Sequence, residues 1–400
     1  MDTPVKKGFA TKVIHGKKLH SKHESDLPIR AISTPIFQSS TFVFESAEEG
    51  AAIFAGEKQG YVYTRLGNPT QAALESDIAY LENGESALAF GSGMAAISTL
   101  TFALAVPGDN LVAAVVLYGG THLFFNEMCP KYSIEVRFQD PANFAALREA
   151  IDSKTRFVFI ETPSNPTLDV YDIEAIAKLC TSKGVPLVVD NTFATPYLQN
   201  PLDLGAEIVV HSATKYLGGH GDTVAGIVIG KNDFIGPLRA KYLRDFGGII
   251  SPFNAWLILR GLKTLPVRMD RHCDSALEVA KYLAFHPKVQ AVYYPGLRTH
   301  PGYRLASKQM RSYGGMLSFD LSGGREAGRK FCNAVKICTL AVSLGDVDTL
   351  ISHPASMTHS TYSKEDLDKA GISEGLIRLS VGLENVEDII EDLRQAMEQI

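Results

Sequence analysis

A lysine and an aspartate stand at the ends of two neighbouring apolar runs in the middle of the chain. Lys215 lies just beyond the strand-like run Glu207–Ser212, and Asp190 ends the run Val185–Asp190. A lysine amine can form a Schiff base with an aldehyde, and a carboxylate can keep a pyridine nitrogen protonated. Either residue alone would be interpreted as a surface lysine or a capping aspartate. Together they indicate the chemistry of pyridoxal 5'-phosphate (PLP).

A run of small residues could hold the phosphate group of the same cofactor. The run Gly91-Ser92-Gly93-Met94 follows the strand-like stretch Ser86–Phe90 and opens a predicted helix. Small residues let the backbone come close to a ligand, and the unpaired N–H groups of a helix N-terminus bind phosphate. The hydroxyls of Ser212 and Thr214 could reach the same group.

Two other kinds of site fit the sequence less well. The run from Gly91 also resembles a dinucleotide fingerprint, which requires an acidic residue at the end of the next strand. The nearest candidate, Asp109, precedes that strand, so the nicotinamide interpretation fails. The histidines His211, His220, His353 and His359 do not have the spacing of a metal site, and we expect no metal.

The elements that must position these residues alternate along the chain. Helical patterns at Pro141–Ser153 and Asp172–Lys183 separate apolar runs that read as buried strands. Such alternation predicts an α/β fold with a mainly parallel sheet covered on both faces, which binds ligands at the carboxyl ends of its strands. The predicted strands are Ser86–Phe90, Leu111–Val116, Arg156–Glu161, Val185–Asp190, Ile208–Ser212 and Val224–Ile229.

The length of 400 residues predicts a large domain with a smaller companion. Residues 1–63 are polar and irregular and read as an extended arm, and residues 64–261 would form the large cofactor-binding domain. Residues 262–400, with the predicted strand Gly315–Leu321 and a terminal helix over Glu384–Ile400, would form a smaller α+β domain.

Composition limits the partners and the compartment. A net charge of −5 gives no electrostatic reason to expect nucleic acid, and the apolar stretches are too short for a membrane span. The N-terminal residues lack the apolar core of a signal peptide. Five cysteines without paired spacing favour a reduced, cytoplasmic protein.

Nine stretches carry a family resemblance. The chain resembles the PLP enzymes of trans-sulfuration, the group that includes cystathionine γ-lyase and methionine γ-lyase. The resemblance implies the aspartate aminotransferase-like architecture of PLP-dependent transferases, called fold type I. The stretches are Tyr61–Thr70, Phe90–Met94, Leu117–Thr121, Glu161–Pro166, Val188–Thr192, His211–Asp222, Ser343–Asp346, His353–His359 and Leu376–Gly382.

The resemblance also implies roles for the cofactor site. Lys215 would hold the cofactor and then move protons, and Asp190 would pair with its ring nitrogen. Tyr118 would stack on the ring and protonate the leaving thiol. The phosphate would be bound by Ser92, Gly93, Met94, Ser212 and Thr214, and by Tyr63 and Arg65 of a neighbouring subunit. This sharing requires at least a dimer, and the family implies a homotetramer built from two such dimers.

The substrate side follows from the same resemblance. Arg378 would bind the substrate carboxylate with help from Ser343 and Asn165, a task suited to a planar bidentate donor. Val342 and Asp245 resemble the methionine γ-lyases, whereas Gly120 stands where those enzymes usually carry cysteine.

The implied reaction is α,γ-elimination of a small sulfur amino acid, L-methionine, to methanethiol, 2-oxobutanoate and ammonia. Cystathionine γ-lyase and O-acetylhomoserine sulfhydrylase activities remain alternatives, since they share the first steps. A catalytically inactive PLP-binding protein is an alternative of another class, because fold does not imply function.

Overall fold

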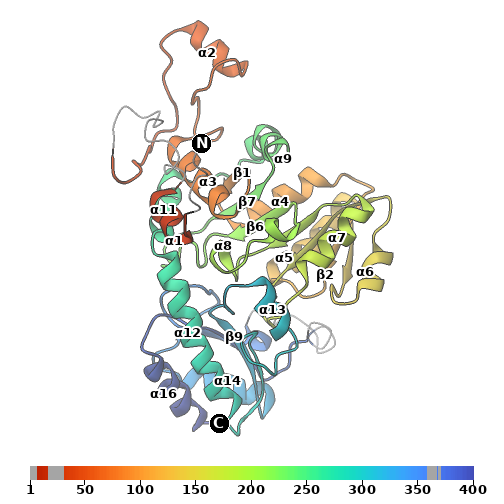
Figure 1. Cartoon of the computed structure of the whole chain (residues 1–400), viewed down its shortest axis with the longest axis vertical. Coiled ribbons are helices and arrows are strands. Elements are labelled where there is room, and N and C mark those ends of the chain that lie inside the picture. The colour runs from red at the N-terminus through yellow and green to blue at the C-terminus, as the bar shows by residue number, and fades with distance from the viewer. Residues whose placement is uncertain (1–6, 17–30, 358–366, 368–370) are drawn as a thin grey trace.

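The computed structural model describes residues 7–16, 31–357, 367 and 371–400. Two β-sheets organise these residues, and the long helix α12 (Leu265–Ala284) passes from the region of the larger sheet to that of the smaller one (Figure 1). None of the described helices combines the length and the apolar composition that a bilayer crossing requires.

The larger sheet has seven strands in the order β1-β7-β6-β5-β4-β2-β3. Its strands are β1 (Ser86–Phe90), β2 (Asn110–Ala114), β3 (Glu135–Gln139), β4 (Thr155–Glu161), β5 (Leu187–Asp190), β6 (Ile208–Ser212) and β7 (Gly226–Gly230). β7 runs antiparallel to both of its neighbours, and the other pairs are parallel, which confirms the predicted mainly parallel sheet.

All six strands predicted for this sheet form, but β3 was not predicted. It lies at the edge of the sheet, and its first residue, Glu135, is exposed while the others are only half-buried. An edge strand with charged residues lacks the continuous apolar run that marks the buried strands.

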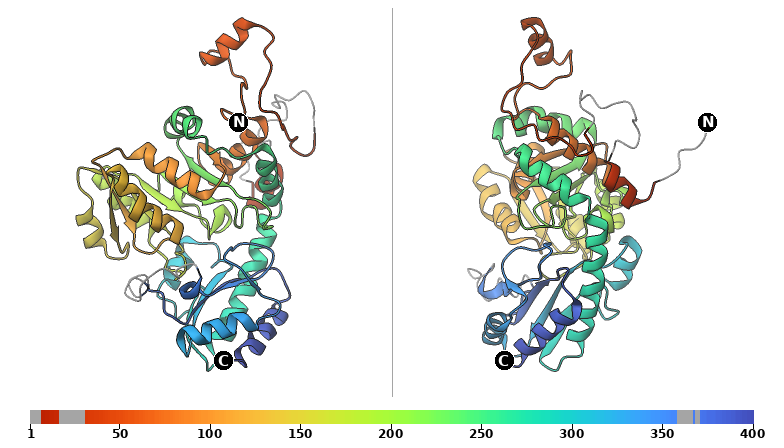
Figure 2. Two further views of the ribbon diagram at one scale, coloured as in Figure 1. Left: turned by 180° about the vertical axis from the view of Figure 1, so that it is seen from behind. Right: turned by 90° about the vertical axis from the view of Figure 1, so that its left-hand side faces the viewer.

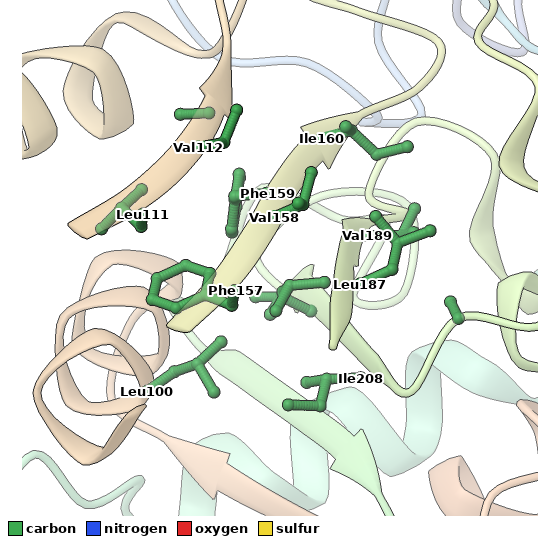
Figure 3. Packing of buried hydrophobic residues seen from close by; sticks show 14 of the residues in the cluster. Leu100, Leu111, Val112, Phe157, Val158, Phe159, Ile160, Leu187, Val189 and Ile208 are labelled. Carbon is green, nitrogen blue, oxygen red and sulfur yellow. The ribbon is translucent and has the colours of Figure 1, made fainter. Parts of the chain in front are cut away.

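Helices cover both faces of this sheet. Alternate residues of β1 enter different cores: Leu88 joins the cluster under α4 (Gly93–Leu104) and α7 (Ile173–Lys183), and Ala89 joins the cluster under α3 (Pro69–Leu81). Figure 3 shows part of the first cluster, to which β2, β4, β5 and Leu100 of α4 all contribute. The period of two along a strand thus fills two cores at once.

The remaining helices of this half are short. They include α5 (Gly119–Leu123), α6 (Phe144–Ala150), α8 (Thr195–Leu198), α9 (Asn232–Pro237), α10 (Arg244–Phe246) and α11 (Pro252–Leu262). The predicted helices around α6 and α7 both form, and α7 begins where the Asp172 side chain accepts a hydrogen bond from the Ala175 N–H.

The smaller sheet has five strands in the order β10-β11-β12-β9-β8. They are β8 (Val289–Tyr293), β9 (Met316–Leu321), β10 (Thr339–Leu340), β11 (Leu350–Ser352) and β12 (Leu376–Ser380). A third core joins this sheet to α12, α14 (Gly324–Ala334) and the terminal helix α16 (Val386–Met397), while α13 (Tyr303–Gln309) precedes β9. The smaller α+β part is therefore confirmed; its exact limits, and the division at residues 63 and 261, stay predictions.

The N-terminal part is less irregular than expected. It contains α1 (Phe9–His15) and α2 (Ala47–Phe54), and the segment with α2 extends away from both sheets (Figure 2). Ser46 caps α2 by accepting from the Glu49 N–H, and a serine three positions before a glutamate is a local signal for such a helix start. Val43 and Phe54 in this segment are largely exposed in the single chain.

Candidate active site

The predicted cofactor residues lie at the edge of the larger sheet where its parallel strands end. Asp190 is the last residue of β5, Ser212 is the last of β6, and Ser92 follows the end of β1. β1 and β6 both run antiparallel to β7 and so point the same way, as β5 does. The fold therefore brings these residues to one edge, as the strand pattern predicts.

Lys215 lies beyond the end of β6 in a mostly buried position. Its Nζ donates to the hydroxyl of Ser343, at 3.0 Å. Burial and then the charge of Arg378 lower the pKa of Lys215 to about 8, against the opposing effect of Asp346. A large share of the amine is therefore neutral at slightly alkaline pH, and a neutral amine is the form that acts as nucleophile or base.

The loop between β10 and β11 of the smaller sheet packs closely against the backbone next to Lys215. Gly345 has a φ of +73°, and a Cβ placed there would lie 2.7 Å from the Tyr216 backbone nitrogen. Only glycine suits both this conformation and this close approach. The Ser380 hydroxyl accepts from the Gly345 N–H at 2.8 Å. β12 therefore positions the loop that contacts the backbone of Lys215 and Tyr216.

Asp190 is buried, and one of its two carboxyl oxygens is already occupied. Oδ1 accepts from the Thr192 N–H at 3.0 Å and from the Thr192 hydroxyl at 2.5 Å. Oδ2 accepts from no residue in the described ranges. Burial raises the pKa of Asp190, and the bonds from Thr192 followed by the charge of His211 oppose this rise.

Thr192 was not singled out from the sequence. Its hydroxyl donates to Asp190 and accepts from the Ser212 N–H at 2.9 Å, and it thereby joins the ends of β5 and β6. A threonine two positions after a strand-ending aspartate is a common turn pattern. That pattern could have drawn attention to Thr192, but the bond to the neighbouring strand could not be read from it.

The start of α4 forms the candidate phosphate site. The Ser92 hydroxyl caps the helix by accepting from the Ala95 N–H at 3.0 Å. The backbone N–H groups of Gly93 and Met94 donate to no described residue, so they are free for an anion. A Cβ at Gly93 would lie 3.1 Å from the Cβ of Ser212, which shows how closely β6 approaches this turn.

The hydroxyl of Thr214 already has two hydrogen-bond partners within its own chain. Its hydroxyl donates to the Ala225 carbonyl at 3.2 Å and accepts from the Ala225 N–H at 3.0 Å. These bonds fasten the turn before Lys215 to the start of β7. A role for Thr214 at the phosphate stays a prediction.

Tyr118 lies at the start of α5, with about half of its surface exposed. Its backbone N–H donates to Glu161 at 2.8 Å, and Glu161 is the register partner of Asp190 on the next strand. Burial and the charge of Asp190 raise the pKa of Glu161 well above its usual range. Glu161, a further residue not singled out, thus anchors the tyrosine loop to the sheet.

Gly120 determines where the Tyr118 ring can lie. A Cβ at position 120 would lie 2.6 Å from Cε1 of that ring. The ring therefore occupies space that any other residue at 120 would need.

Arg378 is 5 % exposed and lies on β12. One terminal nitrogen donates to Oδ1 of Asn165 at 3.1 Å, and the other donates to the carbonyls of Val342 and Ser343 at 2.9 and 3.1 Å. Burial lowers the pKa of Arg378 to about 10, which still leaves the guanidinium charged at neutral pH. The structure thus brings together Arg378 and the two residues predicted to assist it.

Three predicted residues form a separate cluster at the surface. Arg65 donates to the Arg244 carbonyl and lies 5.7 Å from the centre of the Tyr63 ring, and Arg244 pairs with Asp245 at 2.7 Å. Within the described chain, no hydrogen bond joins this cluster to Lys215, Asp190 or Arg378. The roles of Tyr63, Arg65 and Asp245 therefore stay predictions.

The side chains and backbone groups at this edge match the chemical groups of PLP. A buried lysine amine suits its aldehyde, the free oxygen of Asp190 suits a ring N–H, and the N–H groups at the start of α4 suit its phosphate. These three features lie at the ends of β5, β6 and β1, within one sheet edge.

Comparison with known proteins agrees with this fit. Residues 12–398 match the family model described as Cys/Met metabolism PLP-dependent enzyme. The chain belongs to this family. A Fusobacterium nucleatum subsp. nucleatum protein named L-methionine gamma-lyase is 50% identical over 397 residues, which cover 99% of each chain.

Solved structures of family members confirm the fold. Cystathionine gamma-lyase from Lactobacillus plantarum, in complex with L-serine, superposes with a TM-score of 0.91 at 39% identity, covering 98% of this chain and 99% of the other. A putative O-acetylhomoserine (thiol)-lyase from Campylobacter jejuni, which carries a pyridoxyl-lysine phosphate, gives 0.93 at 35% identity, covering 98% and 100%. PLP is thus the cofactor of this family, and a family of Cys/Met metabolism takes small amino-acid substrates.

Proposed function

We propose that the chain is a PLP-dependent carbon–sulfur lyase that acts on L-methionine. With water as co-reactant, α,γ-elimination gives methanethiol, 2-oxobutanoate and ammonia. The observation that carries this proposal is the direct link between a base and a carboxylate clamp: Ser343 accepts from Lys215 through its hydroxyl and from Arg378 through its carbonyl. The 50% identity to a methionine lyase over the whole chain supports the choice of substrate.

Each residue of the site has its own role in this reaction. Arg378 binds the substrate carboxylate, and Asn165 and Ser343 hold the guanidinium in place. Bound PLP supplies an electron-accepting ring for the charge that develops at Cα. The neutral Lys215 amine takes the proton from Cα and takes part in the proton transfer at Cβ, and the Tyr118 hydroxyl donates a proton to the sulfur as it leaves Cγ. Asp190 holds the proton on the ring nitrogen.

The side chain at position 342 favours a thioether substrate. Val342 presents an apolar side chain that is largely exposed in the single chain, while its carbonyl is bound by Arg378. Cystathionine ends in a second amino-acid group, which requires polar partners, whereas methionine ends in an apolar methyl group. Gly120 favours the alternatives, because it removes the side chain that methionine lyases usually carry at that place.

We further propose that Tyr63 and Arg65 complete the phosphate site of a second copy, and that two such dimers form a homotetramer. Both residues are partly exposed, and among the described residues no hydrogen bond joins their cluster to the Lys215 of the same chain. The five cysteines are all free and buried, which supports location in the cytoplasm.

The experiment that tests the function is 2-oxobutanoate release from purified, PLP-loaded protein. L-methionine, L-cystathionine, and O-acetyl-L-homoserine with sulfide are compared, with homocysteine assayed in the last case. We expect fast release from methionine, and none from Lys215→Ala, which should also lose the yellow colour of the loaded protein. Turnover of another substrate without methionine would transfer the proposal to the corresponding alternative, and cofactor binding without any turnover would indicate an inactive binder.

A further inference from the structure

A fully buried carboxylate and imidazole pair lies next to the strand ends that carry Asp190 and Ser212. Glu82, at the C-terminal end of α3, and His211, on β6, both have side chains that are 0% exposed. Nε2 of His211 lies 2.5 Å from Oε1 of Glu82. Burying such a pair costs free energy that an apolar pair of similar volume would not, so its presence calls for a reason.

Three side chains with nitrogen atoms surround the carboxyl group of Glu82. Besides His211, the Asn191 side-chain amide donates to Oε1 at 3.0 Å, and the Asn200 amide lies 3.4 Å from Oε2. Both carboxyl oxygens of Glu82 are therefore within hydrogen-bond distance of side-chain nitrogens. Nδ1 of His211, in contrast, is buried and has no hydrogen-bond partner. A buried ring nitrogen without a partner is unusual, because most buried polar atoms are hydrogen-bonded.

The pair is connected to Asp190 through the backbone on both strands. Asn191, which donates to Glu82, directly follows Asp190, and its amide is fixed further by two bonds with Gln199 at 2.9 and 3.0 Å. His211 directly precedes Ser212, whose N–H binds Thr192 beside Asp190. A change at Glu82 therefore acts on the turn that holds Asp190.

The pair also acts on Asp190 through charge. Burial raises the pKa of Asp190, and the positive charge of a protonated His211 lowers it. On the opposite side Asp190 faces Glu161, whose own pKa is raised by burial and by Asp190 and is lowered by Arg378. The imidazole on β6 therefore acts on the pKa of Asp190 in the same direction as the bonds from Thr192.

We propose that Glu82 and His211 are positioning residues that hold Asp190 in place and in its anionic form against the ring nitrogen of PLP. This inference rests on the proposed function for the reaction that Asp190 serves. Its test uses cofactor readouts that do not depend on the substrate, so that a failure of the methionine assignment leaves it intact.

The test is Glu82→Gln, which preserves the volume and a hydrogen-bond acceptor but removes the charge. An amide offers one acceptor oxygen where the carboxylate offers two, and it no longer balances the charge of His211 that lowers the pKa of Asp190. We expect PLP to bind the apo protein about tenfold more weakly, the effect of losing one charge-assisted interaction. The pH below which the absorbance of bound PLP is lost should move upward, because the pKa of Asp190 rises.

Asp392→Asn is the matched control. Asp392 is another buried carboxylate, which accepts from the backbone N–H groups of Lys336, Ile337 and Cys338 on the smaller sheet's side. It should lower the thermal unfolding midpoint without changing PLP affinity or its pH dependence. If Glu82→Gln behaves in the same way as this control, the pair is structural only and the proposal is overturned.

A second variant tests the proposal even if Glu82→Gln does not fold. His211→Gln retains an amide donor for Glu82 and carries no charge, so it should give the same loss of PLP affinity. The double variant should lose no more than either single variant, since the two residues act as one unit. Additive losses, or unchanged PLP affinity and pH dependence in His211→Gln, would overturn the proposal.

Discussion

The Lys215 amine lies 3.0 Å from the Ser343 hydroxyl, although Lys215 follows a strand of the larger sheet and Ser343 lies between two strands of the smaller one. The carbonyl of the same serine accepts from Arg378. Gly345, two positions further along, lies close to the backbone nitrogen of Tyr216, the residue after Lys215. The base and the residue that binds the substrate carboxylate are therefore parts of one connected unit. Their distance is set by short contacts rather than by the relative position of the two sheets alone.

The buried position of Lys215 predicts a pH dependence for cofactor capture. Its pKa is lowered to about 8, so the amine is mostly protonated below that pH and mostly neutral above it. Only the neutral amine attacks the aldehyde of PLP. The rate of PLP capture by the apo protein should rise about tenfold per pH unit below 8 and level off above it. Stopped-flow absorbance at several pH values measures this, and a midpoint near the ordinary lysine value of 10.5 would contradict it.

The hydroxyl of Thr192 should matter for cofactor affinity. Thr192→Val preserves the shape of the side chain but removes the bonds to Asp190 and to the Ser212 N–H. We expect roughly tenfold weaker PLP binding, because a charged carboxylate loses one donor and a backbone N–H loses its acceptor. Thr192→Ser retains the hydroxyl and should bind PLP almost normally in the same fluorescence titration. Equal losses in both variants would show that packing, not the hydroxyl, is what counts.

Gly120 should control the turnover rate through Tyr118. In Gly120→Ala the new Cβ would lie 2.6 Å from Cε1 of the Tyr118 ring, so the ring must move. A displaced general acid lowers kcat, and we expect about a tenfold decrease with methionine, with PLP affinity little changed. Gly236→Ala is the control, because a Cβ there meets nothing within 4 Å. An unchanged kcat in Gly120→Ala would mean that the ring position is not needed for proton transfer.

The sequence could predict the fold and the sheet-edge part of the site because both depend on local patterns. Apolar runs ending in Asp190 and Ser212, and the small residues after β1, indicate which side chains meet at one edge of a parallel sheet. Contacts made across the fold left no such pattern. Nothing local marks that Glu82, at the end of a helix, meets His211, or that Gly345 lies against Tyr216.

An edge strand and the roles of three residues could not be predicted from local patterns either. β3 lies at the edge of the sheet and is only half-buried, so it lacks the continuous apolar run by which the other strands were predicted. The functions of Arg378, Tyr63 and Arg65 came from family resemblance, since an arginine in an apolar strand or a turn has no distinctive spacing. The structure adds geometry to the first, but only a second copy can test the other two.

The shared site predicts that two inactive variants restore each other. Lys215→Ala lacks the amine, and Arg65→Ala lacks the phosphate contact that we propose for a neighbouring copy. A mixed dimer would contain one site with both defects and one site with a normal Lys215 and a normal Arg65. Mixing the two proteins under conditions that exchange subunits should therefore recover part of the methionine activity, up to about half per mixed dimer if each intact site works independently. Co-expression with two different affinity tags isolates the mixed form, and each variant treated alone is the control. If the purified mixed form has no more activity than Arg65→Ala alone, Arg65 serves its own chain and the shared-site proposal is wrong.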